Sequence, residues 1–146
     1  MKKYVVGFLF SPKLDSVVLI KKNKPDWQRN KLNGVGGSVE CGETPYEAMV
    51  REFREEAGYQ FTDWEQFLAM EVTEPVTLDL VVLFFFRGTL KSNSDAFKIY
   101  SATDEHVAWY DYPLILDKDK LIPNLRWLIP LALSGETGKI TMNKNI

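Results

Sequence analysis

The sequence contains little of the residue types that build disulfides and metal cages in small proteins. Cys41 is the only cysteine and His106 the only histidine among 146 residues. One cysteine excludes a disulfide within the chain and a cysteine-based zinc cage held by one chain. No apolar run approaches the roughly 20 residues that a membrane span needs, and the short run at the N-terminus lacks the small-residue cleavage pattern of a secretory signal. We therefore expect a cytoplasmic protein without a membrane partner.

An excess of positive charge is also missing, because the formal net charge is -2. Without a general basic field, the chain is not expected to bind a nucleic acid polymer. Its 146 residues, 45% of them hydrophobic and 13% aromatic, suit one compact domain that spans residues 1–146 and buries a core of its own. A monomer and a homodimer both agree with this composition.

Runs of β-branched and aromatic residues alternate with turn signals along the chain, which predicts strands. The expected strands are 4–10, 16–22, 64–73, 76–87, 106–112 and 138–142. The run 76–87 is apolar enough to be central in a sheet. Residues 24–31 are polar and predict a loop, and three glycines weaken a regular strand between 32 and 40. Apolar spacing predicts an amphipathic helix over 123–134, bent near Pro130. The expected fold class is mixed α/β in one domain.

Another helix is expected between a start signal at Thr44 and a stop at Gly58. Thr44 suits the N-cap, Pro45 suits the first helical position, and Glu47 completes a capping box. Gly58 then ends the helix. The side chains expected to pack against a sheet are Tyr46, Met49, Val50, Phe53 and Ala57.

Three carboxylates gather on this helix. At about 100° per residue, Glu56 and Glu55 stand about 40° and 60° to either side of Glu52. A solvated acidic face is the general alternative for such a group. Carboxylates that converge on one side also suit Mg²⁺, which prefers hard oxygen ligands. Arg51 can offset their mutual repulsion through Glu55, four residues further along.

A longer motif surrounds these glutamates. It consists of Gly37, five residues, Glu43, seven residues and then the run 51–59, REFREEAGY. Residues 37–59 resemble the Nudix box at every polar and glycine position. Phe53 and Tyr59 depart from the aliphatic residues usual in the family, which we expect to change packing and not chemistry.

The resemblance implies a mixed sheet sandwiched between helices and cleavage of a nucleoside diphosphate linked to another moiety. Carried onto this chain, it implies that Glu52, Glu55 and Glu56 hold Mg²⁺, or Mn²⁺ as a substitute, with a backbone carbonyl of Gly36 or Gly37. The metal would neutralise diphosphate charge and activate a water, and one glutamate would act as the base. The resemblance further implies that Glu43 and Arg51 brace the loop and the helix.

Glu105 is a further candidate, because the family often places an extra metal-binding or basic carboxylate just before a strand in this region. An ordinary loop acid is an equally good interpretation of Glu105. The neighbouring His106 is expected to be structural or to face solvent. Cys41 occupies a free position of the box beside the metal loop, so its oxidation would disturb activity without the thiol being catalytic.

The segments around Asn33, Glu74-Pro75 with Asp79, and Pro123-Asn124 with Pro130 resemble the MutT-like branch that hydrolyses oxidised purine nucleoside triphosphates such as 8-oxo-dGTP. In that branch the residues matching Asn33 and Asn124 help to bind the base, and an amide supplies both the donor and the acceptor that a purine edge requires. The alternatives are a turn residue for Asn33 and a helix cap for Asn124. Ile122 and Leu125 depart from the aromatic and acidic base contacts of the animal enzymes.

Other side chains are weaker candidates for the substrate site. Trp27 suits either base stacking or packing. Lys22, with Lys21 and Lys24, suits either the substrate phosphates or a solvated strand end. Trp109 and Trp127 are expected in the core. Because the box selects diphosphate chemistry only, an ADP-ribose or other nucleotide-conjugate pyrophosphatase and a non-catalytic nucleotide-binding module stay open beside the triphosphate enzyme.

Overall fold

The computed structural model describes residues 1–73, 77–117 and 119–143. Its strands are β1 (Lys2–Phe10), β2 (Ser16–Lys21), β3 (Leu32–Asn33), β4 (Val35–Ser38), β5 (Glu65–Thr73), β6 (Leu80–Thr89), β7 (His106–Asp111) and β8 (Gly138–Asn143). Its helices are α1 (Pro45–Ala57) and α2 (Leu125–Ser134), with short 3-10 helices η1 (Asp26–Gln28), η2 (Asn93–Lys98) and η3 (Leu114–Asp117). These bounds confirm the expected strands and both expected helices to within a few residues.

The strands form one mixed sheet in the order β3-β2-β1-β6-β5-β8, with β4 paired to β1 and β7 paired to β2. Strands β1 and β6 run parallel along their whole length, from Lys2 opposite Val81 to Phe10 opposite Thr89. Strand β6 lies between β1 and β5, which confirms that the apolar run is central. The expected strand near the C-terminus is confirmed as β8, which runs parallel to β5.

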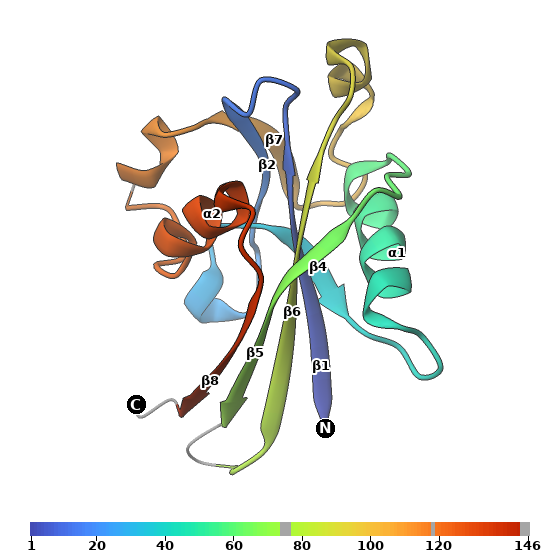
Figure 1. Ribbon diagram of the computed structural model, residues 1–146. Helices are drawn as coiled ribbons and strands as arrows, with labels where there is room; N and C mark the ends of the chain where they lie inside the picture. Colours follow the sequence, from blue (N-terminus) through green and yellow to red (C-terminus); the bar gives the residue numbers. More distant parts are fainter. Residues whose placement is uncertain (74–76, 118, 144–146) are drawn as a thin grey trace.

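The two helices cover opposite faces of the sheet (Figure 1). Helix α1 packs through Ala48, Met49, Phe53 and Ala57 into a core layer with Val5, Leu9, Val18, Ile20 and Phe86. Helix α2 packs through Leu125, Leu128, Ile129 and Ala132 into a second layer with Phe8, Phe10, Leu19, Phe67 and Phe85. Successive side chains of β1 therefore pack into opposite core layers, as the two-residue period of a strand requires. The sandwiched mixed sheet is confirmed.

The glycine segment contains short strands where we expected a weakened one. Val35–Ser38 pairs antiparallel with β1, with Gly36 opposite Val6 and Gly37 opposite Val5. A Cβ on Gly36 would lie 1.8 Å from the carbonyl oxygen of Val5. The glycine therefore permits the pairing, because the absent side chain lets the two backbones approach closely.

Two packing expectations were wrong. Trp127 is 39% exposed and does not belong to the core. Tyr46 is exposed on the outer side of α1, and its hydroxyl donates to the carbonyl oxygen of Thr62 at 2.6 Å. Trp109 does pack against the α1 layer, and its indole N–H donates to the Ala96 carbonyl oxygen. Both errors arise at helix positions that border the apolar stripe, where spacing alone does not decide burial.

The expected junction at Glu74-Pro75 lies outside the described residues. Among the residues that are described, no helix has the length and apolar character needed to cross a bilayer. Pro130 lies inside α2, as the sequence predicted.

Candidate active site

Helix α1 is fixed at both ends by its own residues. The Thr44 hydroxyl oxygen accepts from the Glu47 backbone N–H, and the Glu47 carboxylate accepts from the Thr44 N–H, each at 3.1 Å. At the other end Gly58 adopts a left-handed φ of 68° and donates to the Arg54 carbonyl oxygen. The predicted capping box and glycine stop are therefore confirmed. They set the rotation of the helix and hence the direction in which its glutamates point.

The three glutamates differ in exposure. The side chain of Glu55 is 52% exposed, whereas that of Glu52 is 13% exposed and Glu56 is half-buried. The alternative of a wholly solvated acidic face is therefore wrong for Glu52 and Glu56. Ala48 is fully buried on the flank next to Glu52, a contact that the apolar spacing did not predict. The inward pair thus lies where the helix meets the glycine strand.

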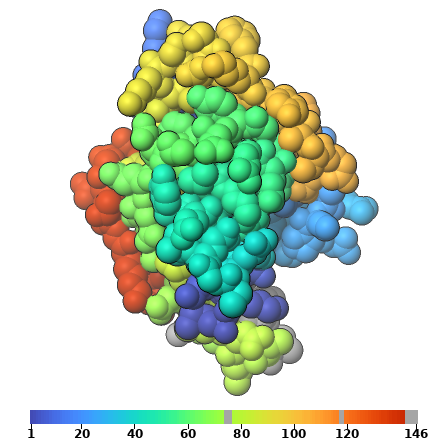
Figure 2. Space-filling model, turned by 90° about the vertical axis from the view of Figure 1, so that its right-hand side faces the viewer, coloured from blue at the N-terminus to red at the C-terminus, as the bar shows by residue number. Residues whose placement is uncertain are grey.

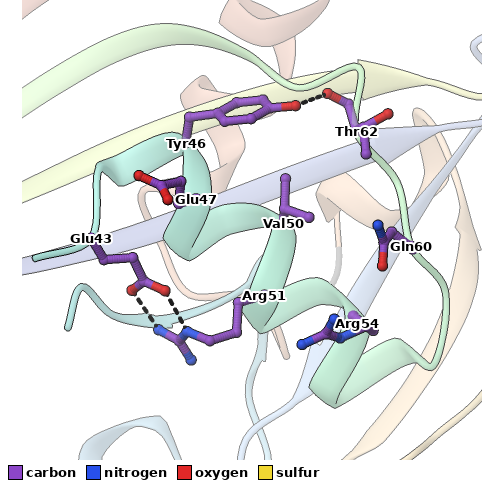
Figure 3. Close-up of a pocket in the computed structure, with 8 residues that line it drawn as sticks. All are labelled: Glu43, Tyr46, Glu47, Val50, Arg51, Arg54, Gln60 and Thr62. Atoms are coloured by element: carbon purple, nitrogen blue, oxygen red, sulfur yellow. Dashed lines mark hydrogen bonds and ion pairs between the residues drawn. The ribbon is translucent and has the colours of Figure 1, made fainter.

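Arg51 contacts several groups in this part of the molecule, and the bracing role that the resemblance implies for Glu43 and Arg51 stays a prediction. Its Nε lies 2.7 Å from Glu43 Oε2, and its Nη1 lies 2.8 Å from Glu52 Oε1 and 3.3 Å from Glu55 Oε2. Its Nη2 donates to the Ser38 carbonyl oxygen at 2.9 Å. The hydrogen bond with Arg51 lowers the pKa of Glu43. One guanidinium therefore links the loop, strand β4 and the acidic face of α1. Figure 3 shows its contact with Glu43.

Gly37 makes room for the Glu52 carboxylate. A Cβ at this position would lie 2.4 to 2.6 Å from the carboxylate carbon and oxygens of Glu52. Only a residue without a side chain allows the carboxylate to rest against the backbone of β4. Burial raises the pKa of Glu52, although the Arg51 guanidinium opposes this shift.

Glu56 is the most perturbed carboxylate of the group. Burial raises its pKa to about 7, the charge of Lys22 opposes the rise, and the charge of Glu105 adds to it. Its Oε2 is buried and has no hydrogen-bond partner among the described residues. A buried acceptor without a donor is costly for a folded chain. This oxygen is therefore available to a cation or to a proton.

The segment after η2 brings Glu105 to the same place. The Tyr100 N–H donates to the Ala57 carbonyl oxygen at 3.1 Å, and the Ala102 N–H donates to the Glu56 carbonyl oxygen at 3.0 Å. The chain thus runs along the end of α1 before it enters β7 at His106. Figure 2 shows α1 at the centre of one face, bordered by the orange residues that lead to β7 and the blue residues that follow β2.

Glu105 is buried, with 8% of its surface exposed, so it is not an ordinary loop acid. Its carboxylate accepts from Lys22 Nζ at 3.2 Å and from the Asn23 backbone N–H at 2.5 Å. Lys22 is therefore not a solvated strand end. His106 is exposed, as expected. The catalytic role of Glu105 and the phosphate contact of Lys22 stay predictions.

The donor chemistry of this site fits magnesium. Within the described ranges, no group of three or more Asp, Glu, His or Cys side chains is close enough to hold a metal ion as it stands. The fit rests on hard carboxylate oxygens, on the unpartnered Glu56 Oε2, and on the space that Gly37 leaves beside Glu52. Arg51 contacts one carboxylate oxygen of Glu52 and one of Glu55, so these side chains are restrained without a metal.

The segments that carry Asn33 and Asn124 are joined through Leu32. Leu32, beside Asn33, bridges Leu121 in parallel and accepts from the Ile122 N–H at 3.0 Å. Asn33 belongs to β3 and not to a turn, and its Oδ1 accepts from the Gly34 N–H at 2.8 Å. Its Nδ2 donates to Gln28 Oε1 at 3.3 Å, a partner that the sequence did not indicate.

Asn124 stands at the N-cap of α2 but makes no side-chain cap hydrogen bond. The helix-cap interpretation of its side chain is therefore wrong. Its Oδ1 is buried without a partner in the described part of the chain. Trp27 lies in η1, with 58% of its surface exposed. Base contacts of Asn33, Asn124 and Trp27 stay predictions.

A hollow lies on the outer side of α1, and neither Glu52 nor Glu56 lines it. It is open and has a volume of about 360 Å³. Its lining residues are Glu43, Tyr46, Glu47, Val50, Arg51, Arg54, Gln60 and Thr62 (Figure 3). The carboxylates of α1 that point inward are not among them, so the hollow does not define the reaction centre. Cys41 is an exposed free thiol outside it.

Comparison with known proteins gives one family match. The profile of the NUDIX domain matches residues 1–130. The comparison with curated proteins gives no match.

Several solved structures share the fold at low identity. The MutT protein from Bacillus halodurans superposes with a TM-score of 0.77 at 18% identity, covering 99% of this chain and 91% of that one. A MutT structure from a study of Aliivibrio salmonicida and Vibrio cholerae has a TM-score of 0.67 at 17% identity, covering 91% of this chain and 96% of that one. The NUDIX domain of Shewanella oneidensis NrtR, complexed with ADP ribose, has a TM-score of 0.73 at 15% identity, covering 90% and 86%.

Proposed function

We propose, from the premise that the chain belongs to the NUDIX family, that it cleaves a nucleoside triphosphate into a monophosphate and pyrophosphate. Membership of the family makes the chain a hydrolase of pyrophosphate bonds. The proposal includes a triphosphate as the substrate. It also takes residues 37–59 as the Nudix box and residues 1–146 as a single domain.

One observation supports the chemistry: Glu52 and Glu55 share Arg51 on α1, and Glu56 of the same helix is influenced by the charge of Glu105 from the segment before β7. Glu52 rests against Gly37, Glu55 shares Arg51 with it, and Glu56 lies within the fields of Lys22 and Glu105. An acidic helix face that is only solvated does not require a glycine beneath one carboxylate or a buried acid on a facing loop. A binding site for a cation and a polyphosphate requires carboxylates that are positioned in this way.

Glu52, Glu55, Glu56 and a main-chain carbonyl of Gly37 are the groups that would hold the metal. When bound, Mg²⁺ or Mn²⁺ would neutralise the diphosphate charge and lower the pKa of the attacking water. The water oxygen forms a bond to phosphorus, the bridging P–O bond breaks, and pyrophosphate leaves. The proton of the water passes to a carboxylate, for which Glu56 and Glu105 are the inward candidates.

The base end of the substrate would lie against Asn33 and Asn124. Both are amides, and the buried Asn124 Oδ1 lacks a donor that a purine edge would supply. Ile122 and Leu125 are aliphatic and belong to the core layer beneath α2, so neither supplies an aromatic ring or a carboxylate for a base. Discrimination for an oxidised purine such as 8-oxo-dGTP therefore rests on the two asparagines, with the exposed ring of Trp27 next to Gln28, the partner of Asn33.

A substrate panel tests the proposal. Purified protein with Mg²⁺ is incubated with canonical and oxidised nucleoside triphosphates, dinucleoside polyphosphates, ADP-ribose and nucleotide sugars, and the products are separated. We expect turnover of a triphosphate to monophosphate and pyrophosphate, abolished by EDTA. If every triphosphate survives, the triphosphate proposal is wrong.

ADP-ribose hydrolysis is the second candidate, because a NUDIX domain of the same fold is described in complex with ADP ribose. Turnover of ADP-ribose alone in the panel would select it. A non-catalytic nucleotide-binding module is the third candidate, because the described acids are not gathered as a ready metal cage. That candidate predicts that the wild type and Glu56→Gln bind nucleotide and are equally inert.

A further inference from the structure

We infer that Lys22 is a positioning residue that holds Glu105 beside Glu56, and that hydrolysis depends on Lys22 through this contact and not through a substrate phosphate. The inference rests on the proposed function for its catalytic part. The contact between Lys22 and Glu105 is a property of the fold and is testable on its own.

The pairing of β2 with β7 sets the contact. Their register places Lys21 opposite His106 in an antiparallel pair. One step beyond this last pair, Lys22 faces Glu105, and its Nζ lies 3.2 Å from Glu105 Oε1. A cross-strand neighbour of opposite charge is a direct consequence of that register.

Glu105 is held from more than one side. The Asn23 N–H donates to Glu105 Oε2 at 2.5 Å, and the Asn23 side chain donates to the Asp104 carbonyl oxygen at 3.4 Å. The Glu105 N–H donates to Thr103 Oγ1 at 3.2 Å. With both carboxylate oxygens occupied by residues that follow β2, the acid cannot swing out to water without losing both contacts.

The surroundings of Lys22 favour an acid partner over a phosphate. Its side chain is 19% exposed, and the charges of Lys22 and Glu105 both act on the Glu56 carboxylate. A phosphate that approached this ammonium would have to compete with Glu105, whose Oε1 already lies 3.2 Å from Nζ. Lysine is a compact charge that can satisfy a carboxylate and still offset a neighbouring one.

Kinetics of Lys22→Met with the fastest triphosphate of the panel test the catalytic part. We expect kcat to fall about 100-fold while KM changes by less than about 3-fold, because loss of an aligned carboxylate affects the transition state and not substrate binding. Lys22→Arg keeps the charge and should restore kcat to within about 10-fold. Glu105→Gln should match Lys22→Met, and the double variant should be no slower than either single variant.

Lys13→Met is the matched control, because Lys13 is exposed in the turn at the opposite end of β2. The substitution removes the same charge as Lys22→Met. It should leave kcat and KM unchanged. A Lys22→Met enzyme that retains kcat while KM rises tenfold or more overturns the inference in favour of a phosphate contact.

Thermal unfolding of metal-free protein separates this inference from the proposed function. Lys22→Met and Glu105→Gln should each lower Tm by about 3 °C, and the double variant by no more than the larger single shift. Additive Tm shifts overturn the contact whether or not the wild type hydrolyses any nucleotide. An inert wild type with coupled shifts rejects the triphosphate proposal and the catalytic part of this inference, and leaves the contact established.

Discussion

Helix α1 begins with a complete capping box and ends on a left-handed glycine, whereas helix α2 begins at Asn124 without a side-chain cap hydrogen bond. Around α1, Arg51 ties the acidic side chains to the loop and to β4. At the start of α2, the buried Oδ1 of Asn124 has no partner among the described residues. The starts of the two helices therefore differ in how far the chain satisfies its own polar groups.

This difference separates two tasks within one fold. Phosphorus chemistry needs carboxylates held in fixed positions, because small misplacements cost large factors in rate. Recognition of a base needs donors and acceptors that the protein has not already paired, because the ligand must supply the partners. The α1 end of the molecule has the first property and the start of α2 has the second. Four predictions test this contrast, from the largest expected effect to the smallest.

Loss of the Glu56 carboxylate should have the largest effect. Glu56→Gln keeps the size of the side chain but removes an anionic oxygen that has no other partner. We expect kcat to fall by about 100- to 10,000-fold if this group takes the proton or holds the metal. Steady-state kinetics with Mg²⁺ measure the change, and circular dichroism confirms folding. Retention of more than a tenth of the wild-type kcat would remove Glu56 from the reaction centre.

A methyl group at residue 37 should have the next largest effect. Gly37→Ala would place Cβ 2.4 to 2.6 Å from the Glu52 carboxylate, which must move away. We expect activity to fall about 100-fold with a small change in Tm, because a flexible side-chain end yields and the backbone does not. Gly138→Ala is the control, because a Cβ there meets nothing within 4 Å. Equal kinetics for both variants would show that the position of Glu52 does not matter.

Alanine at the two helix starts should separate stability from recognition. Thr44→Ala removes a cap hydrogen bond and should destabilise the fold by about 1 kcal/mol, measured by urea unfolding. Asn124→Ala removes no side-chain cap hydrogen bond found among the described residues and should leave the free energy of unfolding within about 0.5 kcal/mol. It should instead raise KM for a purine triphosphate about 10-fold. A larger destabilisation by Asn124→Ala than by Thr44→Ala would reverse the comparison.

The sequence predicted the parts that local rules determine. Strand runs, the capping box of α1 and the link between Arg51 and Glu55 follow from neighbours within a few positions, and all three are confirmed. The resemblance implied that Glu43 and Arg51 brace the loop and the helix, and the ion pair between them, 2.7 Å long, agrees with that prediction without testing it. The burial of Glu52 beside Gly37 was not predicted, because it depends on how closely α1 approaches β4.

The rest depends on contacts between segments far apart in the chain. The sequence marked Lys22 and Glu105 separately, but their contact arises from the register of β2 against β7. The same holds for the segments that carry Asn33 and Asn124, which the bridge between Leu32 and Leu121 joins. Local patterns predict which residues are polar at a strand end and do not predict which strand they face.

The smallest expected effect is the pH dependence of stability in metal-free protein. Burial raises the folded-state pKa of Glu56 from 4.5 to about 7. A carboxyl with a raised pKa contributes stability that is fully present below about pH 4.5 and is lost as the pH rises through about 7. The wild type in EDTA should therefore lose more Tm between pH 5.5 and pH 8 than Glu56→Gln does.

Glu52 should leave a residual slope in that variant, because burial raises its pKa as well. Mg²⁺ should reduce the loss at pH 8 in the wild type, since a bound cation favours the ionised carboxylates. Thermal scans at the two pH values, with and without Mg²⁺, measure both effects. Identical slopes for the wild type and Glu56→Gln would mean that Glu56 is ionised throughout this range, and that the acidic face of α1 is more open to water than its burial indicates.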